Sequence, residues 1–321
     1  MRKRILELMP VLACLTLVLA TAGPAYATFP GRNGRIAFQA QVTPDAHIEI
    51  YTVRQNGHDL RQITHLDADA VKPDWSPDGR QIAFEIDRNE APFCSIALMN
   101  ADGSDIVELT PNEFVCENDP SFTPDGSRIV FDRFDGVDEA FWSMDLTGND
   151  RQRIGNCCAD PNVSPNGEKL SFVAESDQEF QSALFTSNID GSNVFQVAPF
   201  SFGVAIKQDW APDGQHLVFS KYGIGHPPGV SANVVTIRPD GTHLRFVTHY
   251  EGGINANVGS YSPDGRWIVF RLEVNSLSGL FKIHPDGSHL RAILPLSSFR
   301  PRFIDWGAKP SEAEDEDDEG E

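Results

Sequence analysis

Six small polar residues occupy equivalent places in a repeated sequence, and their oxygen atoms could bind a cation, ordered water or backbone amides. Each one immediately precedes the last residue of a short strand-like segment, and that last residue is aromatic in five of the six copies. Because the copies would surround one axis, we expect a central polar ring whose three aspartates could hold a cation. The alternative is that each side chain caps neighbouring backbone amides. The ring residues are Asp74, Ser121, Asn162, Asp209, Ser260 and Asp305.

A second group of residues has the chemistry of a protein-binding surface. Its members are aromatic or imidazole side chains in segments predicted to be long loops, and such side chains are enriched at the centre of protein interfaces. The alternative is that each ring packs beneath its own loop. The predicted partner-binding patch consists of Phe200, Phe202, Tyr222, His226 and Tyr250.

Metal-binding patterns are weak in this sequence. Three histidines in predicted long loops have no close ligand spacing, and they are His65, His226 and His249. Asp67, Asp69 and Asp74 form a loose acidic group that could bind calcium, although a solvated loop explains the same residues. The sequence therefore predicts no metal site and no cofactor, with calcium as the alternative.

Catalytic signatures are missing from the sequence. It contains no G-x-S-x-G nucleophile elbow, H-E-x-x-H pair, P-loop or dinucleotide fingerprint. We therefore predict that the protein is not an enzyme.

A repeat centred on a Ser-Pro-Asp-Gly turn positions these residues. In its clearest copy, residues 75–84, proline presets φ and glycine takes the left-handed conformation that closes a hairpin. The strand that follows places Ile82 and Phe84 on one face, which must be buried. The six copies end in phenylalanines spaced 46, 47, 41, 47 and 51 residues apart, a period typical of a propeller blade. These are Phe38, Phe84, Phe131, Phe172, Phe219 and Phe270.

A second hairpin follows each copy, usually around an Asp-Gly turn such as Asp102-Gly103. The sequence therefore predicts an all-β fold, a six-bladed β-propeller with four antiparallel strands per blade. The first copy lacks its innermost strand, and residues 302–306 match that strand at the far end of the chain. We expect this C-terminal strand to close the ring, which leaves no unpaired sheet edge. The tight turns then lie on one face of the disc and the longer loops on the other, where function is expected.

The two ends of the sequence differ in character from the repeats. Residues 1–27 have the basic start, apolar run and small-residue cleavage site of a signal peptide. Residues 28–307 form the predicted propeller, and residues 308–321 form an acidic tail predicted to be disordered. The net charge is −20, and residues 28–308 still hold 37 acidic against 22 basic residues. Nucleic acid is therefore excluded as an expected partner, and no membrane span is predicted.

Four cysteines remain after the predicted signal peptide. An even number in an exported chain favours disulfides, and three connectivities are open. One of them pairs Cys94 with Cys116 and leaves a vicinal pair of Cys157 and Cys158. Free thiols are the alternative.

The repeated W-S-P-D-G-x-x-I-x-F pattern, with its D-G-S and L-T echoes, resembles the TolB-type, WD-like propeller repeat family. The resemblance covers roughly residues 29–307 and implies an exported propeller that binds a protein. We expect the TolB-like propeller without the N-terminal α/β domain that accompanies it in TolB. The predicted function is a monomeric, non-catalytic propeller, periplasmic or extracellular, that binds a protein partner through its long-loop face. The alternative is a glycan-binding or glycan-active propeller.

Overall fold

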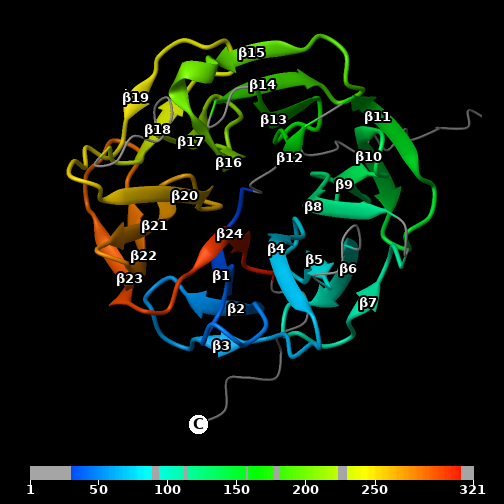
Figure 1. The fold of residues 1–321 in the computed structure, drawn as a ribbon, viewed down its shortest axis with the longest axis horizontal. Coiled ribbons are helices and arrows are strands. Elements are labelled where there is room, and N and C mark those ends of the chain that lie inside the picture. The colour runs from blue at the N-terminus through cyan, green and yellow to red at the C-terminus, as the bar shows by residue number, and fades with distance from the viewer. Residues whose placement is uncertain are drawn as a thin grey trace, which may run out of the picture.

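The computed structural model describes 24 β-strands and one short 3-10 helix, η1 (Phe200–Phe202). The strands form sheets that surround a central axis (Figure 1). The fold is therefore an all-β propeller. The described residues are 30–88, 94–111, 115–156, 158–176, 181–222 and 230–311.

Four of the sheets contain four strands each, and their strands are antiparallel. The first sheet has the order β24 (Arg302–Ala308), β1 (Asn33–Ala40), β2 (Glu49–Arg54) and β3 (Arg61–Gln62). Another contains β12 (Ala159–Val163), β13 (Lys169–Glu175), β14 (Ser182–Asn188) and β15 (Phe195–Ala198). The next contains β16 (Val204–Trp210), β17 (Leu217–Lys221), β18 (Asn233–Ile237) and β19 (Arg245–Phe246). The last contains β20 (Asn255–Tyr261), β21 (Ile268–Val274), β22 (Leu277–Ile283) and β23 (Arg291–Ser297).

The fifth sheet has eight strands because two four-stranded sets share one parallel contact at Cys94 and Cys116. Its first set is β4 (Asp69–Trp75), β5 (Gln81–Asp87), β6 (Cys94–Asn100) and β7 (Val107–Glu108). Its second set is β8 (Cys116–Phe122), β9 (Arg128–Phe134), β10 (Glu139–Asp145) and β11 (Gln152–Asn156).

A disulfide joins Cys94 to Cys116 at this contact between β6 and β8. One of the bridges considered from the sequence is thus confirmed. Cys158 is also disulfide-bonded, whereas Cys157 lies outside the described residues.

Residues far apart in the sequence pair at the first sheet. β24 runs antiparallel to β1, with Asp305 opposite Ala37 and Trp306 opposite Ile36. The backbone N–H of Lys309 donates to the carbonyl of Arg32 at 2.7 Å, just beyond the ladder. Residues 302–308 therefore supply the innermost strand of the sheet that contains β1.

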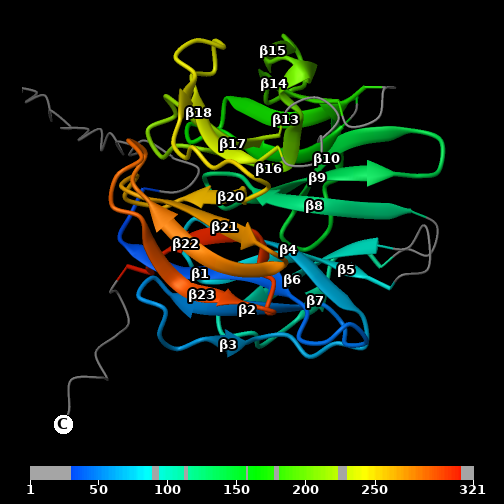
Figure 2. The same cartoon turned by 60° about the vertical axis from the view of Figure 1, so that its left-hand side comes forward.

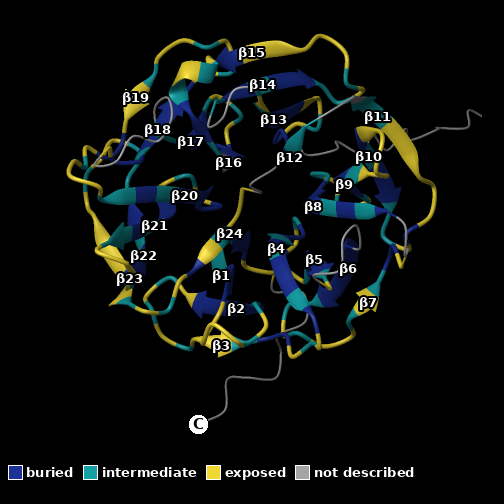
Figure 3. Cartoon of the chain, viewed as in Figure 1, coloured by how far each residue is buried: buried dark blue, intermediate teal, exposed yellow. Residues whose placement is uncertain are grey.

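The core lies between neighbouring sheets, which pack face to face (Figures 2 and 3). All six repeat phenylalanines are buried, with exposures between 0% and 4%, as predicted. Ile82 and Phe84 pack with Trp75 in one cluster, while Ala83, on the opposite face of β5, packs with Ile96 in the next. Both faces of the sheet are therefore buried, which is why the second strands are almost continuously apolar.

The Ser-Pro-Asp-Gly turns contact one another in sequence around the tight-turn face. Gly79 has a positive φ of 69° and donates its N–H to Ser76 O at 2.9 Å. Later turns place their glycine against the proline of the preceding turn, and the pairs are Gly126 with Pro77, Gly167 with Pro124, Gly214 with Pro165 and Gly265 with Pro212. Gly79 instead faces Ala308 and Pro310. The segment after β24 thus fills the place of a preceding turn.

The predicted signal peptide and most of the acidic tail lie outside the described residues. No helix in the described part of the chain is long and apolar enough to cross a membrane.

We predict that Phe84→Ala lowers the free energy of unfolding by about 3–5 kcal/mol, because it leaves a cavity between two sheets. Urea unfolding monitored by tryptophan fluorescence measures this change. The matched control is Phe246→Ala, since Phe246 is 43% exposed and its loss should change stability by only about 0.5 kcal/mol. Equal losses for the two variants would contradict the assigned core.

Candidate functional site

The innermost strand of each four-stranded set faces the axis and carries one residue of the predicted polar ring. Five of the six side chains line one small central cavity of about 20 Å³. They are Asp74, Ser121, Asn162, Asp209 and Asp305. The sixth, Ser260, is fully buried on β20 and binds the backbone of β24. The predicted residues therefore meet near the axis.

Four of these side chains accept hydrogen bonds from the backbone of the next innermost strand. The bonds run from Phe122 N to Asp74 Oδ2 (2.8 Å), Tyr261 N to Asp209 Oδ2 (2.8 Å), Trp306 N to Ser260 Oγ (2.8 Å) and Trp75 N to Asp305 Oδ2 (2.9 Å). Neighbouring strand sets are thus tied together at the axis. This geometry corresponds to the capping role that the sequence left open as an alternative.

One buried cation lies among the central carboxylates. Burial alone would lower the pKa of the Lys207 ammonium, but four aspartates outweigh it and raise that pKa above its ordinary value. They are Asp160, Asp305, Asp74 and Asp209. Burial, followed by the charge of Asp305, raises the pKa of Asp74 well above its ordinary value. The Lys207 ammonium and the central carboxyl groups therefore interact with each other electrostatically.

Sequence reasoning missed a second layer of charged residues, which lie two positions before the polar-ring residue in four of the six innermost strands. Lys72, Asp119 and Asp160 all have positive φ, between 49° and 56°, where the strand register shifts. Such a bulge takes a residue out of the regular alternation of the strand. Comparison of equivalent repeat positions would have revealed that four copies carry a charged residue here, namely Lys72, Asp119, Asp160 and Lys207.

This layer is acidic on the side of β5, β8 and β9. Lys72 Nζ lies 3.1 Å from Glu85 Oε2 and 3.0 Å from Asp119 Oδ1. Burial, with the nearby charge of Asp119, raises the pKa of Asp132 to about 8. Burial also raises the pKa of Glu85 to about 7, even though Lys72 opposes the shift. The Lys72 ammonium therefore interacts electrostatically with three carboxyl groups, those of Glu85, Asp119 and Asp132.

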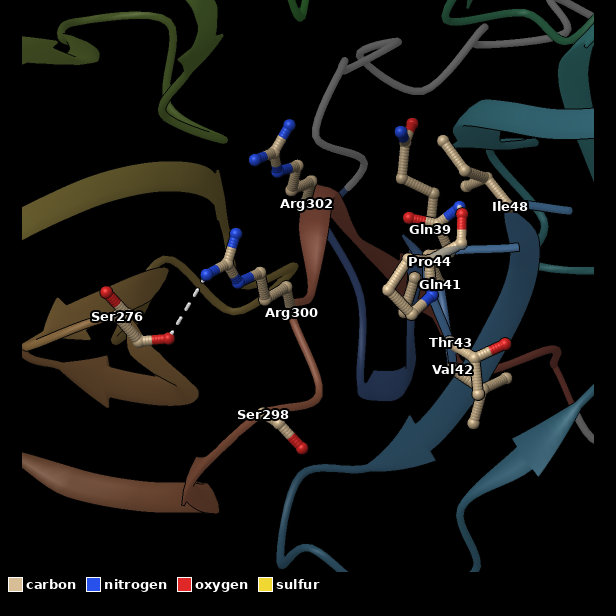
Figure 4. A pocket seen from close by; sticks show the side chains of 11 residues that line it. Gln39, Gln41, Val42, Thr43, Pro44, Ile48, Ser276, Ser298, Arg300 and Arg302 are labelled. Atoms are coloured by element: carbon tan, nitrogen blue, oxygen red, sulfur yellow. Dashed lines mark hydrogen bonds between the residues drawn. The ribbon is translucent and has the colours of Figure 1, made fainter. Parts of the chain in front are cut away.

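Basic residues line two pockets on the long-loop face, and these residues are Lys207, Arg271, Arg300 and Arg302. The larger pocket, about 580 Å³, is lined by Arg300 and Arg302 on one side and by Gln39, Gln41 and Thr43 on the other (Figure 4). Arg300 Nη2 donates to Ser276 O at 3.3 Å. The second pocket, about 270 Å³, shares Arg302 and lies over β16, β20 and β24.

The predicted aromatic patch is only partly assembled. Phe200 lies edge-on to Phe185, and Phe202 lies 5.0 Å beneath Lys221 Nζ. Tyr222 donates its hydroxyl hydrogen to Asn257 Oδ1 at the second pocket, whereas Tyr250 packs against the cluster between β18 and β20. All four side chains are half-buried. His226 lies outside the described residues.

The weaker metal-binding candidates are separated in space. His65 contacts Gln62 and His249 lies against Phe246. Asp67 and Asp69 face His47, while Asp74 points to the axis. Over residues 30–311, with the gaps stated above, no group of three or more His, Cys, Asp or Glu side chains could hold a metal ion.

We predict that the free energy of unfolding falls as the pH rises from about 5 to about 8. Glu85, Asp132 and Asp160 have folded-state pKa values raised to about 7, 8 and 7, so the folded chain retains protons that the unfolded chain has released. Stability then decreases with pH, by about 1.4 kcal/mol per pH unit for each full proton.

Urea unfolding at several pH values measures this slope for the wild-type protein and for Asp132→Asn. The amide removes one titration, so the variant should show a shallower slope. An equal slope in the two proteins, or stability that rises with pH over this range, would contradict the assignment.

Comparison with known proteins identifies the same architecture. The family model described as the TolB beta propeller domain matches residues 21–200 and 109–309. The Tol-Pal system protein TolB of Francisella tularensis subsp. mediasiatica is 28% identical over 215 residues, covering 51% of this chain and 49% of the relative. The uncharacterized peptidase YuxL of Bacillus subtilis is 25% identical over 216 residues, covering 53% of this chain and 31% of the relative.

A solved structure supports the fold directly. The crystal structure of TolB from Acinetobacter baumannii matches with a TM-score of 0.70 at 19% identity, over 88% of this chain and 69% of that one. The chain spans about half or less of the length of the curated relatives. Because the family model matches nearly all of the described residues, this chain belongs to the TolB beta propeller domain family.

Proposed function

We propose that this chain is an exported, non-catalytic propeller that binds a protein partner through its long-loop face. The observation that carries the proposal is that the two faces of the propeller differ in the side chains they present. Charged and amide side chains gather around pockets on the long-loop face, whereas packed Pro and Gly turns cover much of the opposite face. Membership of the TolB propeller family supports a binding role, because the sequence carries no catalytic signature.

We infer that the propeller has six blades and that β24 closes it. The eight-stranded sheet contains two sets of four strands, which share only the contact at Cys94 and Cys116. Counting each set as a blade gives six, in agreement with the six sequence repeats. β24 pairs with β1 and also packs against β4 and β20.

Two features of the chain support export, a disulfide bond and a sequence typical of a signal peptide. The Cys94–Cys116 disulfide is typical of an oxidising compartment such as the periplasm or the extracellular space. Residues 1–27 have the sequence of a signal peptide. Binding of nucleic acid is not proposed, because the net charge is −20.

The opposite face provides a control for the binding test. A hollow of about 660 Å³ there is lined mainly by turn residues such as Pro212, Asp213 and Pro263, together with His216. Four prolines contribute to its lining, and none of the described residues that line it is an arginine or a lysine. We therefore place the partner on the long-loop face.

We predict that Phe200→Ala, Phe202→Ala and Tyr250→Ala, combined in one chain, reduce partner capture from a cell-envelope extract at least about tenfold, a loss of about 1.4 kcal/mol. Quantitative mass spectrometry of the captured proteins measures the loss. His216→Ala is the control on the turn face and should capture the same proteins as the wild type. If the control abolished capture and the triple variant did not, the partner would bind the opposite face.

A further inference from the structure

The second pocket on the long-loop face has buried hydrogen-bond donors that lack acceptors in the described part of the chain. It measures about 270 Å³, and its polar lining comes from Lys207, Asn257, Arg271 and Arg302. Arg271 is 12% exposed. Its Nε and Nη1 atoms are buried and have no hydrogen-bond partner in the described part of the chain. Leaving buried donors unpaired costs about 1–3 kcal/mol each, and more for charged groups.

Asn257 adds a further unpaired donor to the same pocket. Its Oδ1 accepts the hydroxyl hydrogen of Tyr222, so the amide nitrogen is left to donate. That nitrogen is also buried and has no partner among the described residues. Three buried donor atoms, on Arg271 and Asn257, therefore line one pocket without an acceptor among the described residues.

The charge around this pocket is opposite to that of the whole chain. Arg271 pairs through Nη2 with Glu273 at 3.2 Å, while Arg300 and Arg302 are both exposed nearby. No described carboxylate lies within ion-pair distance of Arg300 or Arg302. Burial and the positive charges of Arg302 and Arg300 lower the pKa of Arg271. Among the described residues, Arg271 therefore has one carboxylate partner while Arg300 and Arg302 have none, in a protein whose net charge is −20.

Lys207 forms the floor of the pocket but does not supply this positive charge. Its ammonium is balanced by the four central aspartates named above. The buried donors without a partner among the described residues belong to Arg271 and Asn257, and the exposed Arg302 adds positive charge to the same pocket. A ligand that completes this site must bring acceptor oxygens and negative charge, and it must be small enough to enter.

We propose that this pocket binds a carboxylate group of an acidic peptide segment from the protein partner. Its carboxylate oxygens accept hydrogen bonds from Arg271 and Asn257, while Arg302 stabilises the charge at the rim. The inference rests on the proposed function, because it specifies the chemistry of the partner segment. The carboxylate belongs either to an aspartate or glutamate side chain or to the C-terminus of the partner, and peptide probes distinguish the two sources.

The test uses fluorescence anisotropy with three labelled hexapeptides and the disulfide-bonded full-length protein. Acetylated, amidated hexaglutamate carries only side-chain carboxylates, and acetylated hexaglutamine with a free C-terminus carries only the terminal one. Acetylated, amidated hexaglutamine carries none. We expect one or both carboxylate peptides to bind, more weakly as salt is added, and the uncharged peptide not to bind.

Three variants distinguish peptide binding at the pocket from non-specific electrostatic attraction to the protein surface. Arg302→Gln should weaken binding of the carboxylate peptide about tenfold, because an exposed charge is lost without disturbing the core. Asn257→Asp should abolish binding, since it replaces a donor by a negative charge. Arg238→Gln removes an exposed positive charge at the tight turn after β18, on the turn side of the molecule, and should leave binding unchanged. The melting temperature of each variant reports whether it is folded.

Binding of neither carboxylate peptide to the wild-type protein would overturn the proposal, as would equal weakening by Arg302→Gln and Arg238→Gln. Capture from the envelope extract is then measured with the same variants. Capture that persists in Arg302→Gln and Asn257→Asp, but is lost in the aromatic triple variant, would overturn the carboxylate pocket and leave the proposed function standing.

Discussion

Hydrogen bonding between neighbouring innermost strands is the constraint on which this structure depends. Each strand set would otherwise expose the backbone at its inner edge, and buried backbone groups without partners are costly. Side-chain oxygens of Asp74, Asp209, Ser260 and Asp305 accept the amides of the next strand. The residues that tie the sheets together therefore also fill the axis. The room left there is only about 20 Å³.

Two groups of charged side chains lie on the strands around this centre. Around Lys72, carboxyl groups outnumber cations, whereas around Arg271 buried donors outnumber acceptors. The two regions lie in different strand sets of the same rigid scaffold. The carboxyl groups around Lys72 are buried, whereas Arg300 and Arg302 are exposed. A partner segment at the second pocket would therefore meet positive charge, which can select its orientation electrostatically.

Much of the fold could be predicted because the turn chemistry and the apolar strand that ends in phenylalanine repeat in every copy. The buried phenylalanines and the convergence of Asp74 with Asp305 follow from equivalent positions, whereas the Cys94–Cys116 bridge was one of three connectivities that the sequence left open. The charged layer could not be predicted in this way, because non-glycine residues such as Lys72 adopt positive φ at a bulge that alternation does not encode. The donor pocket also escaped prediction, since Asn257 and Arg271 meet only through pairing of β20 with β21.

The most direct test of this account is urea unfolding of a chain that lacks residues 301–308. If β24 completes the sheet of β1 and ties β4 to β20, its removal exposes those edges, and the cooperative transition should be lost. A chain that lacks only residues 312–321 is the control and should unfold like the parent. A chain without β24 that unfolded with the midpoint and cooperativity of the parent would contradict the central claim.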